Sequence, residues 1–207
     1  GLMENRMGRI NTANIKKTLY YLKRNGMINT WYAVRERLEE QKKAPYSFVP
    51  VSEEQLEKQR EWSSDKGVIF SIVVPTYRTN EEYLREMIQS VVNQTYPHWE
   101  LVLADATEDD SVRNAVDKIT YDINKSEKGY NIKFVKLAEN AGIAANTNQA
   151  LQHATGDYIG LLDHDDVLTP DALYEMAVRI EKEKKLGIEL QMLYSDEDKC
   201  NGEGTHF

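Results

Sequence analysis

The sequence lacks the features that mark several common classes of protein. Its 207 residues contain one cysteine, Cys200, which excludes an internal disulfide framework and a multi-cysteine zinc site. No apolar run approaches the ~20 residues needed to span a bilayer, and no signal-peptide pattern begins the chain. A glycine-rich phosphate-binding loop is also absent. The lack of a membrane span and of a signal peptide makes a cytoplasmic protein the default expectation.

Charge is unevenly distributed along the chain. The net charge is −8, yet residues 1–66 contain thirteen Lys and Arg against nine Asp and Glu, whereas the remainder contains thirteen against twenty-five. The stretch from Asn5 to Val34 has six basic residues and no acid. It is either a positive face for acidic lipid or a phosphate-bearing acceptor, or a solvated helix surface. Nucleic-acid binding is not expected, because basic residues are not interleaved with a stacking platform.

Residues 1–66 are expected to form a small N-terminal helical extension. Apolar residues at helical spacing predict two short amphipathic helices, marked by Ile15, Leu19, Leu22, Trp31, Val34 and Leu38. Ser52 and Gln55 have the spacing of a capping box, which predicts a third helix running toward Trp62. We expect the extension to pack beside the following domain, with Trp31 or Trp62 as an anchor.

From Val68 onward the pattern changes, and residues 67–207 form the second predicted domain. Short apolar runs alternate with amphipathic stretches, which predicts βαβ units and an α/β fold with a mostly parallel sheet. The predicted strands are Ile69–Val74, Glu100–Ala104, Ile132–Leu137, Asp157–Leu162 and Leu190–Tyr194. The predicted helices are one N-capped by Thr79, one around Val112–Ile123, Ala144–Ala154, and Pro170–Lys185 with Thr169 as N-cap.

Polar residues follow the predicted strands. Right-handed crossovers bring the carboxyl ends of parallel strands to one edge of a sheet. That edge would receive Pro75, Thr76, Tyr77, Arg78, Asp105, Asn140–Gly142 and Asp163–Asp166. The set suits a nucleotide, since Tyr77 can stack on a base and Asp105 can accept hydrogen bonds from a base or ribose.

The acids at the end of the fourth predicted strand indicate a metal. Three of the four residues from Asp163 to Asp166 are carboxylates, which repel one another unless a cation or protons intervene. Oxygen ligands favour Mg²⁺ or Mn²⁺, and such an ion can neutralise a diphosphate. The alternative is an acidic turn that caps the helix opened by Thr169 and Pro170.

With these motifs in place, the chain resembles the family 2 glycosyltransferases of the GT-A fold, which has a Rossmann-like sheet with flanking helices. The match runs from Val68 to Asp198 and consists of Ser71–Tyr77, Ser90–Tyr96, Trp99–Leu101, Asn140–Gly142 with Asn148, and Gly156–Ile159 leading into Asp163–Asp166. The Asp-His-Asp-Asp form and the later Tyr194–Lys199 are similar to the bacterial branch that builds rhamnan and O-antigen-like polysaccharides.

The resemblance implies transfer of a sugar, with inversion, from a nucleotide-diphosphate donor to a saccharide or lipid-linked saccharide acceptor. It implies that Pro75, Thr76 and Tyr77 line the base pocket and that Asp105 contacts the base. Within the Asp-X-Asp element, Asp163 faces the ribose or metal and Asp165 binds the metal, Mn²⁺ or Mg²⁺. Asn148 either touches the donor or bonds to the backbone of its helix.

The chain departs from the family pattern in two respects. Ala104 stands where the family often has a second acid, so one carboxylate remains on the base side. The family's general base and acceptor region normally follow the metal motif at a distance, so they are expected beyond Phe207. Asp196, Glu197 and Asp198 are either acceptor-side acids or a solvated loop. The expectation is a donor-binding half of a longer enzyme of cell-surface polysaccharide synthesis, in the cytoplasm or at the inner face of the membrane.

Two other function classes compete with this interpretation. One is a non-catalytic sugar-nucleotide-binding module or assembly subunit that docks a partner through its basic segment. The other is a phosphoryl-transfer domain, which shares the Mg²⁺ chemistry. It is disfavoured because the acids follow the fourth predicted strand rather than the first, and because the glycine-rich loop is absent.

Overall fold

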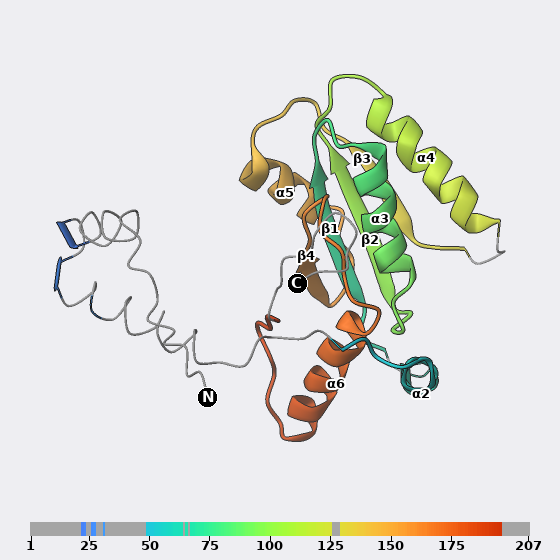
Figure 1. Cartoon of the computed structure of the whole chain (residues 1–207), viewed down its shortest axis with the longest axis vertical. Helices are drawn as coiled ribbons and strands as arrows, with labels where there is room; N and C mark the ends of the chain where they lie inside the picture. The colour runs from blue at the N-terminus through green and yellow to red at the C-terminus, as the bar shows by residue number, and fades with distance from the viewer. Residues whose placement is uncertain are drawn as a thin grey trace, which may run out of the picture. The chain divides into compact units, whose positions relative to one another are not determined.

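The computed structural model describes residues 49–195 except 64, 66 and 126–128, together with residues 22, 23, 26, 27 and 31. The chain divides into two compact units, Gly1–Val49 with Glu197–Phe207, and Pro50–Asp196. Figure 1 shows the chain, and the elements described below belong to the second unit. Most of the two predicted N-terminal helices, and the acids at positions 196–198, lie outside the described residues. Among the described residues, no helix is long and apolar enough to cross a membrane.

A parallel sheet forms the centre of the unit Pro50–Asp196. Its four strands are β1 (Phe70–Thr76), β2 (Trp99–Asp105), β3 (Ile132–Lys136) and β4 (Tyr158–Leu161), in the order β3-β2-β1-β4. β1 and β2 are buried along almost their whole length, as their continuous apolar runs require in a sheet covered on both faces. The predicted α/β class and parallel sheet are confirmed, with these four strands close to their predicted positions.

The fifth predicted strand is wrong. Leu190–Tyr194 has no regular secondary structure. Side chains hold this segment instead of a strand ladder, because Leu190 and Leu193 pack against the core and the Tyr158 hydroxyl donates to the Leu190 carbonyl at 3.0 Å. The Tyr194 side chain is 86% exposed. An apolar run of this length does not by itself distinguish a strand from irregular chain.

Helices cover the two faces of the sheet through alternating residues of β1. Phe70, Ile72 and Val74 belong to the cluster that contains side chains of α3 (Glu81–Val92), α4 (Ser111–Asn124) and α6 (Ala172–Lys185). Val73 points the other way and packs with Ala150 of α5 (Ile143–Leu151). Figure 1 shows α3 and α4 on the side of the sheet opposite α5. Because helices cover both faces of the sheet, the ends of its strands remain for a polar site.

The predicted capping box is confirmed at the start of α2 (Glu53–Ser63). The Ser52 amide donates to Gln55 Oε1 at 3.2 Å, and the Gln55 amide donates to Ser52 Oγ at 3.4 Å. Trp62, near the end of α2, packs edge-to-face on Tyr174 of α6, with ring centroids 5.1 Å apart. The compact unit Pro50–Asp196 includes α2, which lies within the predicted extension of residues 1–66. The domain boundary at 66/67 stays a prediction.

Two predicted N-caps are wrong by one or two residues. Asn80, not Thr79, caps α3, because its side chain accepts the Glu82 amide at 2.8 Å. Asp171, not Thr169, precedes α6, because Pro170 and Asp171 form a turn before the helix starts. The carbonyl of Thr169 accepts hydrogen bonds from Ala172 and from the side chain of Gln94.

Candidate functional site

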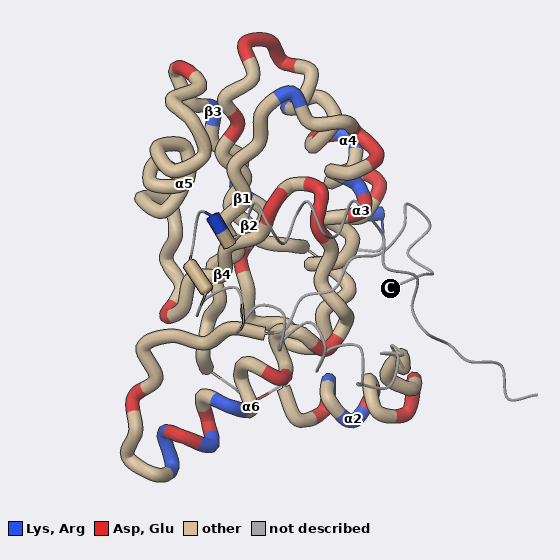
Figure 2. Tube along the Cα trace, turned by 60° about the vertical axis from the view of Figure 1, so that its left-hand side comes forward, with Lys and Arg blue, Asp and Glu red and all other residues tan. Residues whose placement is uncertain are grey.

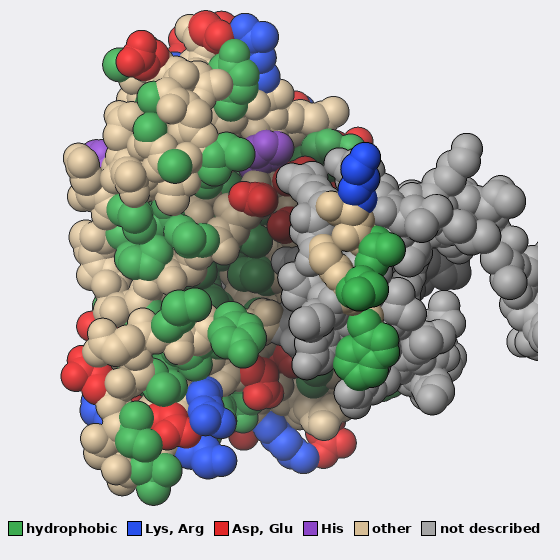
Figure 3. Space-filling model, turned by 90° about the vertical axis from the view of Figure 1, so that its left-hand side faces the viewer, with side chains coloured by type: hydrophobic (Ala, Val, Ile, Leu, Met, Phe, Trp, Pro, Cys, Tyr) green, Lys and Arg blue, Asp and Glu red, His purple; other side chains and the backbone are tan. Residues whose placement is uncertain are grey.

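A pocket of about 300 Å³ lies where β1 and β4 end and α5 begins. It is lined by Pro75, Thr76 and Tyr77 after β1, by Asn140, Gly142, Ile143 and Asn146 around the start of α5, and by Asp163, His164 and Asp165 after β4. The structure thus brings five of the predicted site residues, Pro75, Thr76, Tyr77, Asp163 and Asp165, around one cavity. The space-filling view in Figure 3 shows acidic side chains close to hydrophobic ones on one face of the molecule. Such a mixture suits a ligand with an aromatic and an anionic part, the latter through a cation.

The loop before α5 is shaped by one glycine and two asparagines. Gly142 has φ +88° and ψ 165°, a conformation that is essentially restricted to glycine. Asn140 Oδ1 accepts the Gly142 amide at 3.1 Å and Asn146 Nδ2 at 3.0 Å. Asn146 Oδ1 in turn accepts the Ala141 amide at 3.2 Å. This network, in which the Asn146 side chain is buried, fixes one wall of the pocket.

Asn146 is a site residue that sequence reasoning missed. It is buried and lines the pocket, whereas Asn148 is exposed on α5 and does not line it. The signal was present, since Asn146 lies four residues after Gly142, where a side chain on the first helical turn can fold back to the preceding loop. The predicted donor contact of Asn148 is not tested by these contacts and stays a prediction.

Asp105 is completely buried and does not line the pocket. Its Oδ1 accepts hydrogen bonds from Thr76 Oγ1 at 3.2 Å, from the Thr107 amide at 3.1 Å and from Thr107 Oγ1 at 2.6 Å. Its Oδ2 pairs with Lys136 Nζ at 3.0 Å. The carboxylate therefore joins the ends of β1, β2 and β3, and its partner Thr76 lines the pocket. Its predicted contact with a base stays a prediction, and the structure adds this bracing role.

The two carboxylates of the Asp-X-Asp element are accessible from the pocket. Asp163 and Asp165 are both exposed, and the Asp166 amide closes a turn onto the Asp163 carbonyl at 3.2 Å. His164 Nδ1 lies 3.8 Å from Asp165 Oδ1. Within the described part of the chain, no three or more His, Cys, Asp and Glu residues are grouped to hold a metal. Two carboxylates still fit Mg²⁺ or Mn²⁺, because such ions commonly take one or two protein carboxylates and complete their shell with phosphate and water oxygens.

The surroundings of the pocket are acidic on the side of β2. The loop from β2 to α4 carries Glu108, Asp109 and Asp110, and Figure 2 shows acids along the loops at the upper end of the view. Basic side chains also contact this loop: Lys136 through the Asp109 carbonyl, Arg78 through Glu108 and Arg113 through Asp110. An anionic ligand therefore needs a cation to approach the exposed carboxylates.

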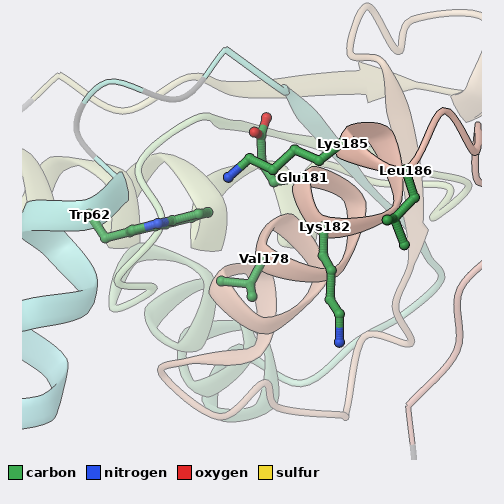
Figure 4. A pocket seen from close by; sticks show the side chains of 6 residues that line it. All are labelled: Trp62, Val178, Glu181, Lys182, Lys185 and Leu186. Carbon is green, nitrogen blue, oxygen red and sulfur yellow. The ribbon is translucent and has the colours of Figure 1, made fainter.

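A second cavity, of about 390 Å³, lies between α2 and α6 (Figure 4). It is lined by Trp62, Val178, Glu181, Lys182, Lys185 and Leu186. None of the predicted site residues borders it. The pocket at the strand ends is therefore the better candidate for chemistry, although it is the smaller of the two.

Comparison with known proteins gives a consistent set of matches. The family described as glycosyl transferase family 2 matches residues 71–199. The putative teichuronic acid biosynthesis glycosyltransferase TuaG of Bacillus subtilis is 33% identical over 105 residues, covering 51% of this chain and 39% of TuaG. The O-antigen biosynthesis protein RfbC of Myxococcus xanthus is 31% identical over 136 residues, covering 66% of this chain and 10% of RfbC.

A solved structure, S. aureus TarS 1-349, is 29% identical with a TM-score of 0.47 and covers 56% of this chain and 33% of that one. The chain therefore spans less than half the length of each of these three proteins.

Proposed function

Because this chain belongs to glycosyl transferase family 2, we propose that it is the donor-binding half of an inverting, metal-dependent glycosyltransferase. The reaction transfers a sugar from a nucleotide-diphosphate donor to a saccharide or lipid-linked saccharide acceptor. The observation that carries this proposal is the pocket in which Pro75, Thr76 and Tyr77 face the two acids Asp163 and Asp165. The names of TuaG and RfbC support a role in bacterial cell-surface polysaccharide synthesis.

Different residues of the pocket bind different parts of the donor. Tyr77 takes the base against its ring, and Asp163 faces the ribose or the metal. Asp165 is the direct metal ligand. A bound Mn²⁺ or Mg²⁺ supplies the positive charge that offsets the negative charge of a departing nucleoside diphosphate. The loop at Asn140 and Gly142 lines a further side of the pocket.

Transfer also needs a base that removes the proton of the acceptor hydroxyl. We place this base, with the acceptor region, beyond Phe207 in the full protein. Residues 1–66 are then the helical extension, whose basic stretch contacts the inner face of the membrane. The position of the base and the membrane contact are both inferred from the family resemblance, and each is to be tested in the full-length protein.

Calorimetric titration of the chain with UDP and with dTDP, in Mn²⁺ and in EDTA, tests the donor-binding function. We expect metal-dependent binding that Asp165→Ala weakens by at least about tenfold, because a metal ligand is lost. The matched control is Asp117→Ala, which removes an exposed acid from α4. Unchanged metal-dependent affinity in Asp165→Ala counts against the assignment. Metal-independent binding favours a sugar-nucleotide-binding module instead.

A further inference from the structure

Tyr77 is restrained by two neighbours that do not line the pocket. Its hydroxyl donates to Glu108 Oε1 at 3.0 Å, and the guanidinium carbon of Arg78 lies 5.1 Å from the centre of its ring. Arg78 and Glu108 also bind each other at two points, Nη2 to Oε1 at 2.8 Å and Nε to Oε2 at 3.1 Å. A two-point arginine–carboxylate pair fixes orientation as well as distance. The ring of Tyr77 is thus held both at its hydroxyl and over its face.

The backbone of Arg78 is fixed independently of its side chain. Its φ is +50°, the only positive value of a non-glycine residue in the described part of the chain. The Arg78 amide donates to Thr107 Oγ1 at 2.8 Å, and Thr107 is bound to the buried carboxylate of Asp105. Such a backbone conformation persists only where its surroundings determine it. The loop after β1 is therefore locked to the loop after β2 at the residue that follows Tyr77.

We propose that Arg78 and Glu108 are positioning residues that clamp the Tyr77 ring against the base side of the pocket. The inference rests on the proposed function, because it concerns how the same pocket recognises a nucleoside diphosphate. The clamp acts on the base and not on the diphosphate, since the two acids after β4 are separate from it. An already oriented ring avoids the loss of side-chain freedom that stacking on a base would otherwise cost.

The clamp is charged under all ordinary assay conditions. Hydrogen bonds from Arg78, and then from the Glu108 amide and from Tyr77, lower the pKa of Glu108 to about 2. Glu108 raises the pKa of Arg78 in return. Above about pH 5 both groups therefore remain ionised, and effects of the variants below do not arise from titration of this pair.

The test compares UDP with inorganic pyrophosphate, each with Mn²⁺, because pyrophosphate lacks the base. We expect Arg78→Ala to weaken UDP binding by about three- to tenfold and to leave pyrophosphate binding unchanged. Arg85→Ala is the matched control, because Arg85 pairs with Glu81 and Asp122 away from the pocket. In a Tyr77→Ala background, Arg78→Ala should have no further effect. The proposal is overturned if Arg78→Ala weakens UDP and pyrophosphate binding equally. It is also overturned if Arg78→Ala weakens UDP binding as much in the Tyr77→Ala background as in the unmodified chain.

A second experiment uses no ligand, so it tests the clamp independently of the proposed function. The protein is labelled with 3-fluorotyrosine, and the Tyr77 signal is assigned from its absence in Tyr77→Phe. We expect Arg78→Ala, but not Arg85→Ala, to shift this signal toward that of an exposed tyrosine and to narrow it. An unchanged Tyr77 signal shows that the clamp does not exist. If the signal responds but the unmodified chain binds no nucleotide, the proposed function fails, and the role of the clamp in recognition fails with it.

Discussion

At the scale of single residues, the pocket depends on backbone conformations as much as on functional groups. Gly142 lies at the start of α5 with a positive φ, and a Cβ at this position would meet no atom within 4 Å. Any cost of a side chain there is therefore conformational and not steric. The amide of Gly142 is also held by Asn140, so a change in φ would move the wall of the pocket.

Gly142→Ala is predicted to destabilise the protein by about 1–3 kcal/mol, because alanine is strained in this conformation. It should also weaken nucleotide binding, since the wall of the pocket moves. Thermal unfolding and the UDP titration measure the two effects. Gly129→Ala is the control, because Gly129 has open space and no positive φ, and its substitution should change stability by less than about 0.5 kcal/mol. If Gly142→Ala changed stability and UDP affinity no more than Gly129→Ala does, the loop before α5 would tolerate other backbone conformations.

The sequence located Pro75, Tyr77, Asp163 and Asp165 near one another because the carboxyl ends of parallel strands share an edge. It did not show that Asp105 is buried, because burial depends on Thr76, Thr107 and Lys136 from three separate segments. Asn146 was missed for a different reason, because its position four residues after Gly142 marks it but hydrophobic periodicity does not. Its role comes from a hydrogen bond to Asn140, which no periodic pattern records.

Among the strands and helices, Glu100 connects the strands of the sheet at their amino ends, away from the pocket. Its side chain, buried at the start of β2, accepts hydrogen bonds from Ser71 of β1 at 2.6 Å and from the Thr155 amide before β4 at 2.6 Å. Lys133 of β3 pairs with it at 2.7 Å. One carboxylate thus joins β1, β2, β3 and the segment that leads into β4.

Glu100→Gln is predicted to destabilise the protein at neutral pH by about 2–3 kcal/mol, because a charged hydrogen-bond network is broken in a buried position. Burial alone would raise the pKa of Glu100, but hydrogen bonds from Lys133, Ser71 and Thr155 outweigh it and lower the pKa to about 2. The stabilisation is therefore fully present above about pH 4.5 and is lost as the pH falls toward 2.

Denaturant unfolding of both proteins between pH 7 and pH 2.5 measures this effect. The difference in unfolding free energy should shrink as the pH falls below about 4.5. Glu54→Gln is the control, since Glu54 forms an exposed ion pair with Lys58 that contributes little. A difference that stays constant with pH would mean that the carboxylate charge is not what stabilises the network.

Strands proved easier to predict from sequence than the limits of helices or the path of the last segment. β1 and β2 are buried along almost their whole length, so their apolar composition is sufficient to predict them. The start of α6 depends instead on the turn at Pro170 and on the contact of Gln94 with the Thr169 carbonyl. Leu190–Tyr194 fails as a strand because Tyr158 and the core bind it through side-chain contacts.

At the scale of the whole molecule, the unit Pro50–Asp196 contains the sheet, both core clusters and the candidate site. The donor-binding function can therefore be tested on this chain, although it spans less than half the length of TuaG. The proposed ligand of the pocket between Tyr77 and Asp165 is a nucleoside diphosphate together with a divalent metal.

The most direct measurement is the amide NMR spectrum of the chain with UDP and Mg²⁺, before and after replacement of Mg²⁺ by Mn²⁺. Paramagnetic Mn²⁺ broadens the signals of residues close to it. We expect the signals of Gly142, His164 and Asp165 to disappear while those of α2, which contacts Thr95 and His98 before the amino end of β2, remain. The Asp165→Ala variant should lose the effect. Broadening that centres elsewhere, or none in the presence of UDP, would contradict the account.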